Sequence, residues 1–411
     1  MKYEEVIEII ENKRRFGNAP GVEISRVLLS AVSNPQKDLK FVHIAGTNGK
    51  GSTAAFLASI LKEAGIKTGL FTSPHLISFT ERIRVDGEQI PKERAAEIGE
   101  MLLNLELDVH PTMFDYCLAM AMLYFKEQNC EIVVLETGLG GRLDSTNCIE
   151  PPLISIITKI GYDHTNVLGN TLPEIATEKA GICKAGTQAV IEKQDKEVLD
   201  VLTAVCKNLD IPVHIADAAE MTMKNYFSNM KMRGNFQKEN ASAAILAAKI
   251  LQTMEYPITE ASLQKGISHA LWQGRMELIC EEPFLLIDGA HNSHGVHALA
   301  ESLKTMYPGE KFHFIMGVLA DKDYEQMAEL ILPLAKDVVT VTPESSRALQ
   351  SEKLAEYICK KGIPAKSGKD LKSVFTPYLK KEKIYPKNEK TITFGSLYFI
   401  GDVRKFFHLS V

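Results

Sequence analysis

The chain has 411 residues, which is too long for one ordinary hydrophobic core, so two domains are expected. Its 45% hydrophobic and 24% charged residues are typical of a soluble globular protein, and its net charge of −5 gives no general attraction to nucleic acid or to an anionic membrane. No apolar run approaches the roughly 18 residues of a transmembrane helix. We therefore expect small molecules as partners, with no nucleic acid and no membrane.

The cysteine pattern and the N-terminus predict the compartment. The seven cysteines are scattered, with no CxxC pair, which argues against a disulfide framework and favours a reducing compartment. Residues 1–15 form a charged amphipathic pattern that lacks the apolar core and the cleavage site of a signal peptide. We expect a cytoplasmic protein, and we expect it to be a monomer.

In the first part of the chain, short β-branched runs alternate with longer helical patterns. This alternation is typical of a parallel sheet covered by helices. The expected strands are 41–45, 68–71, 131–136, 153–158 and 188–191, and the expected helices include 53–64 and 114–126.

A second alternation begins after Arg275, which predicts a domain boundary there. The expected strands are 284–288, 312–317, 338–341 and 391–394, and the expected helices are 295–306, 324–334, 352–360 and 397–407. We therefore expect an α/β protein with a P-loop ATP-binding parallel-sheet domain at 1–275 and a smaller Rossmann-like domain at 276–411. Residues 217–234 show no clear pattern.

The strongest local signal is the segment GTNGKGST at 46–53, between the strand at 41–45 and a helix. Glycines let successive backbone N–H groups point at phosphate oxygens, and the helix N-terminus adds its positive dipole end. Lys50 would reach the β- and γ-phosphates. Gly51 separates Lys50 from Ser52, so the strict P-loop pattern is not matched and a bare glycine turn is the alternative. The flanking strand and helix favour a phosphate site.

Four further segments place reactive residue types where parallel strands end, at the edge where α/β proteins bind ligands. Glu136 ends a hydrophobic strand and could coordinate Mg²⁺. Ser73 and His164 follow two other strands, and Lys179 lies where a helix gives way to a loop. Each could instead be an ordinary solvated or satisfied side chain. Their common location favours a site.

The second domain also contains a strand that ends in an acidic residue. Asp288 follows the strand and could hold a ribose hydroxyl or a phosphate partner, while His291 could contact phosphate. His291, His294 and His297 also suggest zinc. That alternative is weak, because no cysteine or carboxylate nearby completes a tetrahedral set.

Taken in chain order, these motifs resemble the Mur ligase superfamily, and most closely its folylpolyglutamate synthase and dihydrofolate synthase branch. The resemblance runs from about residue 17 to residue 401. The matching segments are GTNGKGST (46–53), FTSPHLISFTERIRVDG (71–87), LETGLGGRLDSTN (135–147), GYDHTNVLGNT (161–171), EKAGI (178–182), IDGAHN (287–292) and FGSLYF (394–399).

The resemblance implies roles for these positions. It implies two Mg²⁺ sites and a carbamate on Lys179, and it places Lys50, Lys179 and His291 among the catalytic residues. The implied ATP-binding residues are Gly49, Lys50, Gly51, Ser52, Asn240, Arg275 and Asp288. The implied metal ligands are Ser73, Glu136 and His164. The implied pterin or folate site contains Thr112, Met113, Phe114, Asp115, Leu143, Asp144 and Ser145, with residues 18–21 closing over it.

The activity that the resemblance implies is an ATP-dependent carboxylate–amine ligation. ATP would convert a carboxylate to an acyl phosphate, and L-glutamate would then attack it. The acceptor would be dihydropteroate, the terminal glutamate of a reduced folate, or both. The alternatives are polyglutamylation only, another Mur-type amide ligase such as a cell-wall precursor ligase, and an ATP-binding switch without ligation.

Overall fold

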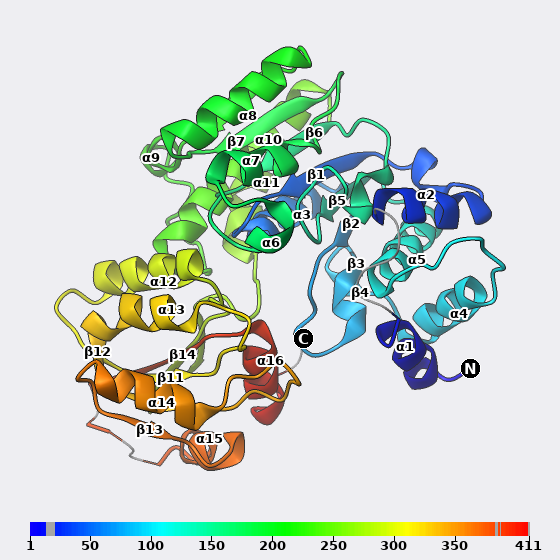
Figure 1. Cartoon of the computed structure of the whole chain (residues 1–411). Helices are drawn as coiled ribbons and strands as arrows, with labels where there is room; N and C mark the ends of the chain where they lie inside the picture. The colour runs from blue at the N-terminus through cyan, green and yellow to red at the C-terminus, as the bar shows by residue number, and fades with distance from the viewer. Residues whose placement is uncertain (14–20, 383–384, 387, 410–411) are drawn as a thin grey trace. The chain divides into compact units, whose positions relative to one another are not determined.

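The computed structural model describes residues 1–13, 21–382, 385–386 and 388–409. The chain forms two compact units. The first comprises Met1–Lys231 and Lys238–Leu271, and the second comprises Met232–Gln237 and Trp272–Val411. In Figure 1 the first unit runs from blue to green, and most of the second runs from yellow to red.

The first unit is built on an eight-stranded sheet with the order β4-β3-β2-β5-β1-β6-β7-β8. The pairs from β2 to β8 are parallel, whereas β3 pairs antiparallel with both β2 and β4. The central strands β1 and β5 are fully buried and mostly apolar, as expected for a parallel sheet covered on both faces. The strands are β1 (Phe41–Ala45), β2 (Thr68–Phe71), β3 (Ile83–Val85), β4 (Glu88–Gln89), β5 (Ile132–Glu136), β6 (Ile154–Ile157), β7 (Gln188–Glu192) and β8 (Val213–Ala216).

Helices of the first unit bury their apolar sides against this sheet and against one another. One core cluster joins α1, α2, α4 and α5 to β1, β2 and β5, and another joins α7 and α8 to β6 and β7. The helices are α1 (Tyr3–Glu11), α2 (Gly21–Ala31), α3 (Lys50–Glu63), α4 (Lys92–Leu103), α5 (Met113–Glu127), α6 (Thr165–Leu168), α7 (Leu172–Ala180), α8 (Lys196–Asn208), α9 (Ala218–Met223), α10 (Asn235–Thr253, which belongs to this unit from Lys238 on) and α11 (Glu260–His269).

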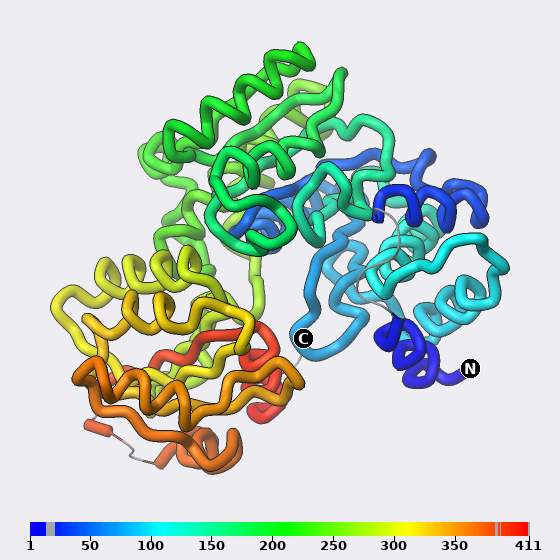
Figure 2. The backbone as a smooth tube through the Cα atoms, in the orientation of Figure 1, coloured from blue at the N-terminus to red at the C-terminus, as the bar shows by residue number. Residues whose placement is uncertain are grey.

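The second unit has a six-stranded sheet with the order β13-β12-β11-β14-β10-β9, in which only β9 runs antiparallel among the described strands. The backbone trace in Figure 2 shows its helices following the strands in alternation. Its elements are β9 (Glu277–Cys280), β10 (Phe284–Ile287), α12 (Ser293–Met306), β11 (Phe312–Met316), α13 (Tyr324–Ile331), β12 (Ala335–Thr340), α14 (Ser351–Lys360), β13 (Ala365–Ser367), α15 (Leu371–Leu379), β14 (Lys390–Phe394) and α16 (Leu397–Phe406).

The expected α/β fold class is confirmed, and two of the differences in detail concern the short strands and the start of α3. The first is that β3, β4, β8, β9 and β13 were not expected: they have two to four residues each and carry little of the apolar pattern that marks a central strand. The second is that α3 begins at Lys50 rather than at Thr53. Gly49 is its N-cap and has a φ of 93°, so the glycine turn leads straight into the helix.

Two further expectations concern the chain's surroundings and its N-terminal segment. Within the described ranges, no helix is long and apolar enough to cross a membrane. Residues 18–20, expected to close over a pterin, lie outside the described residues, and only Gly21 of that segment is described.

Candidate functional site

The glycine loop after β1 is shaped by close backbone contacts. A Cβ on Gly49 would lie 2.2 Å from Oδ1 of Asn240, so only glycine fits there and the Asn240 side chain lies against the loop. The Lys50 ammonium donates hydrogen bonds to the carbonyl oxygens of Gly46 at 3.1 Å and Thr47 at 3.3 Å. Ser52 is buried in the first turn of α3. The structure thus brings Asn240 and Lys50 together at the loop.

Lys179 reaches the same loop from the end of α7. It is only 4% exposed, and its Nζ donates a hydrogen bond to the carbonyl oxygen of Gly46 at 2.8 Å. Burial, together with the nearby charge of Lys50, lowers the pKa of Lys179 to about 7. Two lysine side chains therefore converge on one backbone carbonyl, and one of them is an amine that is substantially neutral near pH 7.

Ser73 and Glu136 meet at the ends of β2 and β5. The Ser73 N–H donates a hydrogen bond to Oε2 of the buried Glu136 carboxylate at 3.0 Å. His164 follows β6 in a left-handed conformation (φ 51°, ψ 38°), its side chain is half exposed, and its Nε2 lies 3.8 Å from Oδ1 of Asp163. A hydroxyl and a carboxylate are the hard oxygen donors that Mg²⁺ prefers, so Ser73 and Glu136 fit that ion.

The described ranges contain no cluster of three side chains that commonly bind metal ions. No group of three His, Cys, Asp or Glu residues there could hold an ion by itself. Mg²⁺ commonly keeps several waters and takes substrate phosphate oxygens as ligands, so it does not require such a group.

The glycine turn after Glu136 packs directly on the segment that carries Lys179. A Cβ on Gly141 would lie 2.7 Å from the carbonyl oxygens of both Glu178 and Lys179. The Arg142 N–H donates a hydrogen bond to the Glu178 carbonyl oxygen at 2.8 Å. A Cβ added to Gly181 would lie 2.4 Å from the Cβ of Arg142. The two sequence motifs therefore interlock, which fixes the position of Lys179 relative to the end of β5.

The residues expected at the pterin site form a hydrogen-bonded cluster around Asp115. Its Oδ1 accepts from the hydroxyls of Ser25 at 2.6 Å and Ser145 at 2.7 Å. Its Oδ2 accepts from the N–H and the hydroxyl of Thr112 at 2.8 and 2.6 Å. Asp115 is 1% exposed, so its carboxylate is occupied by protein donors and holds α2, α5 and the Ser145 segment together.

Asp144 is held in a similar way inside the glycine turn. Its Oδ2 accepts from the Leu139 N–H at 2.7 Å, and its Oδ1 accepts from the Thr146 N–H at 3.0 Å and the Thr146 hydroxyl at 2.5 Å. Burial raises the pKa of Asp144, and these hydrogen bonds oppose the rise. The neighbouring Leu143 is 43% exposed, which leaves an apolar side chain available to a ligand.

The aromatic member of the expected pterin site lies next to the glycine turn. A Cβ on Gly138 would lie 2.7 Å from the ring of Phe114, and the Phe114 ring is 5.7 Å from that of Phe71 between centroids. Met113 begins α5 and packs partly buried against the same core. Asp115, Asp144 and Phe114 therefore all border the turn that also supports Lys179.

In the second unit, the expected residues Arg275, Asp288 and His291 border the loop after β10. Asp288 accepts hydrogen bonds from the N–H groups of Met276 at 2.9 Å and Ala290 at 2.8 Å. Burial raises the Asp288 pKa, and the charge of Arg275 opposes this. A Cβ added to Gly289 would lie 2.5 Å from the guanidinium of Arg275. The His291 Nδ1 is hydrogen-bonded to the Gly289 carbonyl oxygen at 2.8 Å.

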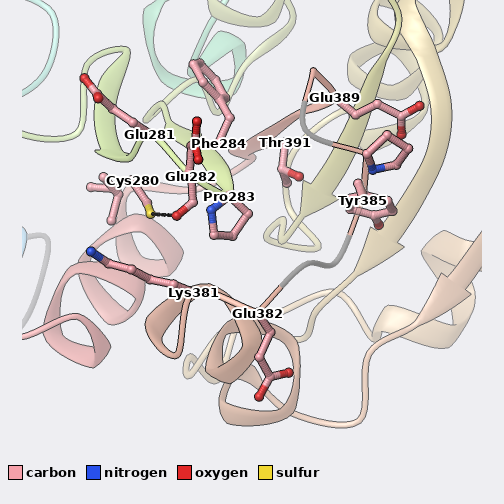
Figure 3. Close-up of a pocket in the computed structure, with 12 residues that line it drawn as sticks. Cys280, Glu281, Glu282, Pro283, Phe284, Lys381, Glu382, Tyr385, Glu389 and Thr391 are labelled. Carbon is pink, nitrogen blue, oxygen red and sulfur yellow. Dashed lines mark hydrogen bonds between the residues drawn. The ribbon is translucent and has the colours of Figure 1, made fainter.

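A cavity of about 880 Å³ also lies in the second unit, between the β9–β10 turn and the segment before β14. Figure 3 shows its lining, which includes Glu281, Glu282 and Tyr385, and the hydrogen bond from Cys280 Sγ to the Glu282 carbonyl. None of the expected site residues lines it.

Sequence reasoning missed the side chains that support the glycine loop from the neighbouring strands. The Thr158 hydroxyl donates to the Asn48 carbonyl at 2.7 Å, and Thr47 Oγ1 is hydrogen-bonded to both the N–H and the carbonyl of Gly161. Glu192 and Gln194 hold the same segment from β7. Glu192 ends its strand as Glu136 does, so the same signal could have found it.

Comparison with known protein families defines the class of protein. Residues 44–248 match the Mur ligase middle domain, and residues 274–381 match the Mur ligase glutamate ligase domain. The chain is therefore a Mur-type ligase, as its motifs predicted.

Individual relatives define the branch. The chain is 36% identical over 429 aligned positions to the dihydrofolate synthase/folylpolyglutamate synthase of Bacillus subtilis, covering 98% of each. The Mycobacterium tuberculosis folylpolyglutamate synthase complexed with ADP aligns with a TM-score of 0.87 at 27% identity, covering 99% of this chain and 98% of that one. The Escherichia coli FolC in complex with DHPP and ADP aligns with a TM-score of 0.86 at 25% identity, with the same coverages.

The chain belongs to the dihydrofolate synthase/folylpolyglutamate synthase family of ATP-dependent Mur-type ligases. The expected family, fold class and enzyme class are confirmed.

Proposed function

We propose that this chain uses ATP to join L-glutamate to dihydropteroate and to the terminal glutamate of reduced folates. The observation that carries the proposal is the convergence of Lys50 and Lys179 on the Gly46 carbonyl, at the sheet edge where Glu136 ends β5. The Lys50 cation, a second amine in Lys179 and a buried carboxylate at one phosphate loop suit phosphoryl transfer to a carboxylate. Family membership supports the proposal, because the Bacillus subtilis relative is named for both reactions.

The chemistry requires two steps, because a carboxylate and an amine do not condense at neutral pH. In the first step, a carboxylate oxygen of the acceptor attacks the γ-phosphorus of ATP, the bond to ADP breaks, and an acyl phosphate forms. In the second step, the deprotonated amine of glutamate attacks the acyl carbon and phosphate leaves. Lys50 would neutralise charge on the transferred phosphoryl group.

Mg²⁺ would be held by Ser73, Glu136 and His164, with phosphate oxygens completing its ligands. When bound, it would offset negative charge on the transferring phosphoryl group. The direct hydrogen bond between the Ser73 N–H and Glu136 supports this assignment, since it holds two of the three residues together. Asn240, Arg275 and Asp288 would contact the nucleotide, and His291 would contact phosphate.

Lys179 would carry a carbamate in the active enzyme. A protonated lysine is a poor metal neighbour, whereas its adduct with CO₂ presents anionic oxygen. The adduct forms when the neutral amine attacks CO₂ and loses a proton, and a pKa of about 7 supplies that neutral amine. The burial of Lys179 against the loop supports the proposal, because water and competing anions are kept away from it.

The folate side of the site would use the cluster built around Asp115 and Asp144. Because the carboxylates of both residues already accept hydrogen bonds from the protein, we propose that they shape the pocket. Direct contacts to the pterin would then come from Phe114, Leu143 and the backbone of the glycine turn. Leu143 is exposed and Phe114 borders the turn, which supports this division.

We also propose that the chain is a cytoplasmic monomer. All seven cysteines are described and unpaired, which fits a reducing compartment. Light scattering of the purified protein tests the monomeric state.

The experiment that tests the function supplies ATP, Mg²⁺ and L-glutamate with either dihydropteroate or tetrahydrofolate and separates the products. The proposal expects glutamate-dependent ADP release and a glutamylated product with each acceptor. Product from tetrahydrofolate alone would leave a polyglutamylating enzyme. ADP release that requires no acceptor, or that requires no glutamate, would contradict the ligase function.

A further inference from the structure

The end of β7 carries a buried carboxyl group beside the phosphate loop that the mechanism above does not use. Glu192 is the last residue of that strand and is 2% exposed. Its Oε2 accepts a hydrogen bond from the Lys159 N–H at 2.8 Å. Its Oε1 accepts a longer hydrogen bond, 3.4 Å, from the hydroxyl of Thr53. The carboxyl group thus bridges the segment after β6 and the first turn of α3.

The backbone of Lys159 is itself a support of the phosphate loop. Its carbonyl oxygen accepts hydrogen bonds from the N–H groups of Thr47 at 3.0 Å and Asn48 at 3.3 Å. Glu192 therefore accepts from the N–H of a residue whose carbonyl oxygen, in the next peptide group, holds the start of the loop. Through Thr53 it also contacts the helix that follows the loop.

Gln194, two residues further on, makes matching contacts with the same segment. Its Oε1 accepts from the Ile160 N–H at 3.1 Å, and its Nε2 donates to the Thr158 carbonyl at 3.0 Å. Glu192 and Gln194 together fix the backbone of residues 158–160. Glu192 differs from Gln194 in that it is ionisable and also reaches α3.

We propose that Glu192 is a positioning residue for nucleotide binding, which holds both sides of the phosphate loop through the Lys159 backbone and the Thr53 hydroxyl. The inference rests on the proposed nucleotide-binding role of that loop. A loop held in advance in its binding conformation binds more tightly, because less conformational entropy is lost when the ligand arrives. Glu192 would act through the loop, without touching the nucleotide.

The charge state of Glu192 supports this role. The pKa of Glu192 is raised to about 8. Burial is the largest cause and the nearby Glu239 of α10 adds to it, while the hydrogen bonds from Lys159 and Thr53 and the charge of Lys159 oppose the rise. Asp217 and Lys193 lie near Glu239 and act on it in opposite directions. Glu192 is therefore mostly neutral at pH 7. The Glu192 carboxyl group therefore adds little negative charge near the proposed nucleotide phosphates until the pH rises through about 8.

Binding of ADP with Mg²⁺, measured by calorimetry, tests this role without requiring ligation. Glu192→Gln keeps the shape, accepts from Lys159 and can donate to Thr53, so its affinity at pH 7 should match that of the wild type. Glu192→Ala loses both contacts, and its affinity should fall about tenfold. Ser155→Ala is the matched control, since it removes another buried hydrogen bond of the same sheet, from Ser155 to the Ile182 carbonyl. Its ADP affinity should not change.

The pH dependence separates positioning from general stability. Wild-type affinity should fall as the pH rises through about 8, whereas Glu192→Gln should show a smaller fall over the same range. Identical pH profiles for the two proteins would overturn the inference, even if Glu192→Ala does not fold. Unchanged affinity in a folded Glu192→Ala would overturn it as well. A wild-type chain that binds no ADP would instead overturn the proposed function, and this inference with it.

Discussion

The phosphate-loop edge and the cluster around Asp115 lie in the same unit, yet they hold their charged groups in different ways. At the loop, the buried ammonium of Lys179 donates to the neutral carbonyl of Gly46. In the cluster, the buried carboxylate of Asp115 accepts four hydrogen bonds from Ser25, Ser145 and Thr112. The Lys179 nitrogen donates to a single carbonyl and so keeps capacity for an added ligand, whereas a carboxylate with four donors is already satisfied.

We therefore expect the phosphate-loop edge to take part in catalysis, and the cluster around Asp115 to maintain the structure of the folate pocket. Substitutions at the loop should therefore reduce turnover with little loss of stability. Substitutions in the cluster should reduce stability and folate binding more than the chemical step.

The largest effect is expected for Lys50→Ala. It removes the cation over the loop, so turnover should fall by roughly a hundredfold to a thousandfold while the fold remains intact. Lys62→Ala, at the other end of α3, is the matched control and should retain turnover. Steady-state rates and circular dichroism of both variants check this. Near-normal turnover in folded Lys50→Ala would remove the basis for the phosphate-loop assignment.

Lys179→Ala should lose activity to a similar extent, because no carbamate can then form. Short-chain carboxylic acids should restore part of the rate, since they can supply anionic oxygen in the space left by the side chain. The measurement is turnover with and without added acetate or formate. Full activity of Lys179→Ala without any additive would rule out the carbamate role.

Gly141→Ala tests whether the interlock of the two motifs positions Lys179. The new methyl group would meet the carbonyl oxygens of Glu178 and Lys179 at 2.7 Å, so the end of α7 must shift. A displacement of this kind should cost roughly tenfold to a hundredfold in turnover. Gly65→Ala is the control: no atom lies within 4 Å and its φ is +78°, so it carries the backbone strain of replacing a glycine without displacing the end of α7, and it should keep most of the turnover. Equal turnover in the two variants would show that this contact does not position Lys179.

The pH dependence of turnover should reflect the neutral amine of Lys179. Burial and Lys50 lower its pKa to about 7, so at pH 6 about one tenth of the amine is neutral and able to bind CO₂. Activity at limiting CO₂ should therefore fall by about tenfold from pH 8 to pH 6, and added bicarbonate should partly reverse the fall. An acid limb that does not respond to bicarbonate would contradict this origin.

The smallest effect on chemistry is expected for Asp115→Ala. It leaves several buried donors without their acceptor, so the free energy of unfolding should fall by about 3 kcal/mol, while kcat at saturating folate changes little. Asp38→Ala, which breaks the exposed ion pair with Lys126, is the control and should cost less than about 1 kcal/mol. Denaturant unfolding and folate titration check both. Loss of kcat without loss of stability would place Asp115 with the reacting groups.

The parts of the fold and site that could be predicted are those encoded in neighbouring residues. The GTNGKGST segment lies between a buried strand and a helix, so its position at a sheet edge follows from local pattern. The resemblance then supplied roles for residues such as Asn240 and Lys179. Hydrogen bonds and close contacts place both of them against the loop.

The parts that could not be predicted depend on contacts between distant segments. Asp115 is hydrogen-bonded to Ser25, 90 residues away in the sequence, and to Ser145, 30 residues away. The sequence alone therefore does not indicate that its carboxylate is fully hydrogen-bonded. Glu192 supports the loop only because β7 lies next to β6 in the sheet order. The short edge strands were missed because pairing with a neighbour, more than their own pattern, determines them.

The measurement that tests the central claim most directly follows a heavy-oxygen label from the acceptor's carboxylate. If the phosphate-loop edge activates that carboxylate as an acyl phosphate, one labelled oxygen must leave with the inorganic phosphate when glutamate attacks. Mass spectrometry of the released phosphate should therefore show one labelled oxygen for each product formed, with either dihydropteroate or a reduced folate. Phosphate free of label, in a reaction that makes the glutamylated product, would contradict the account.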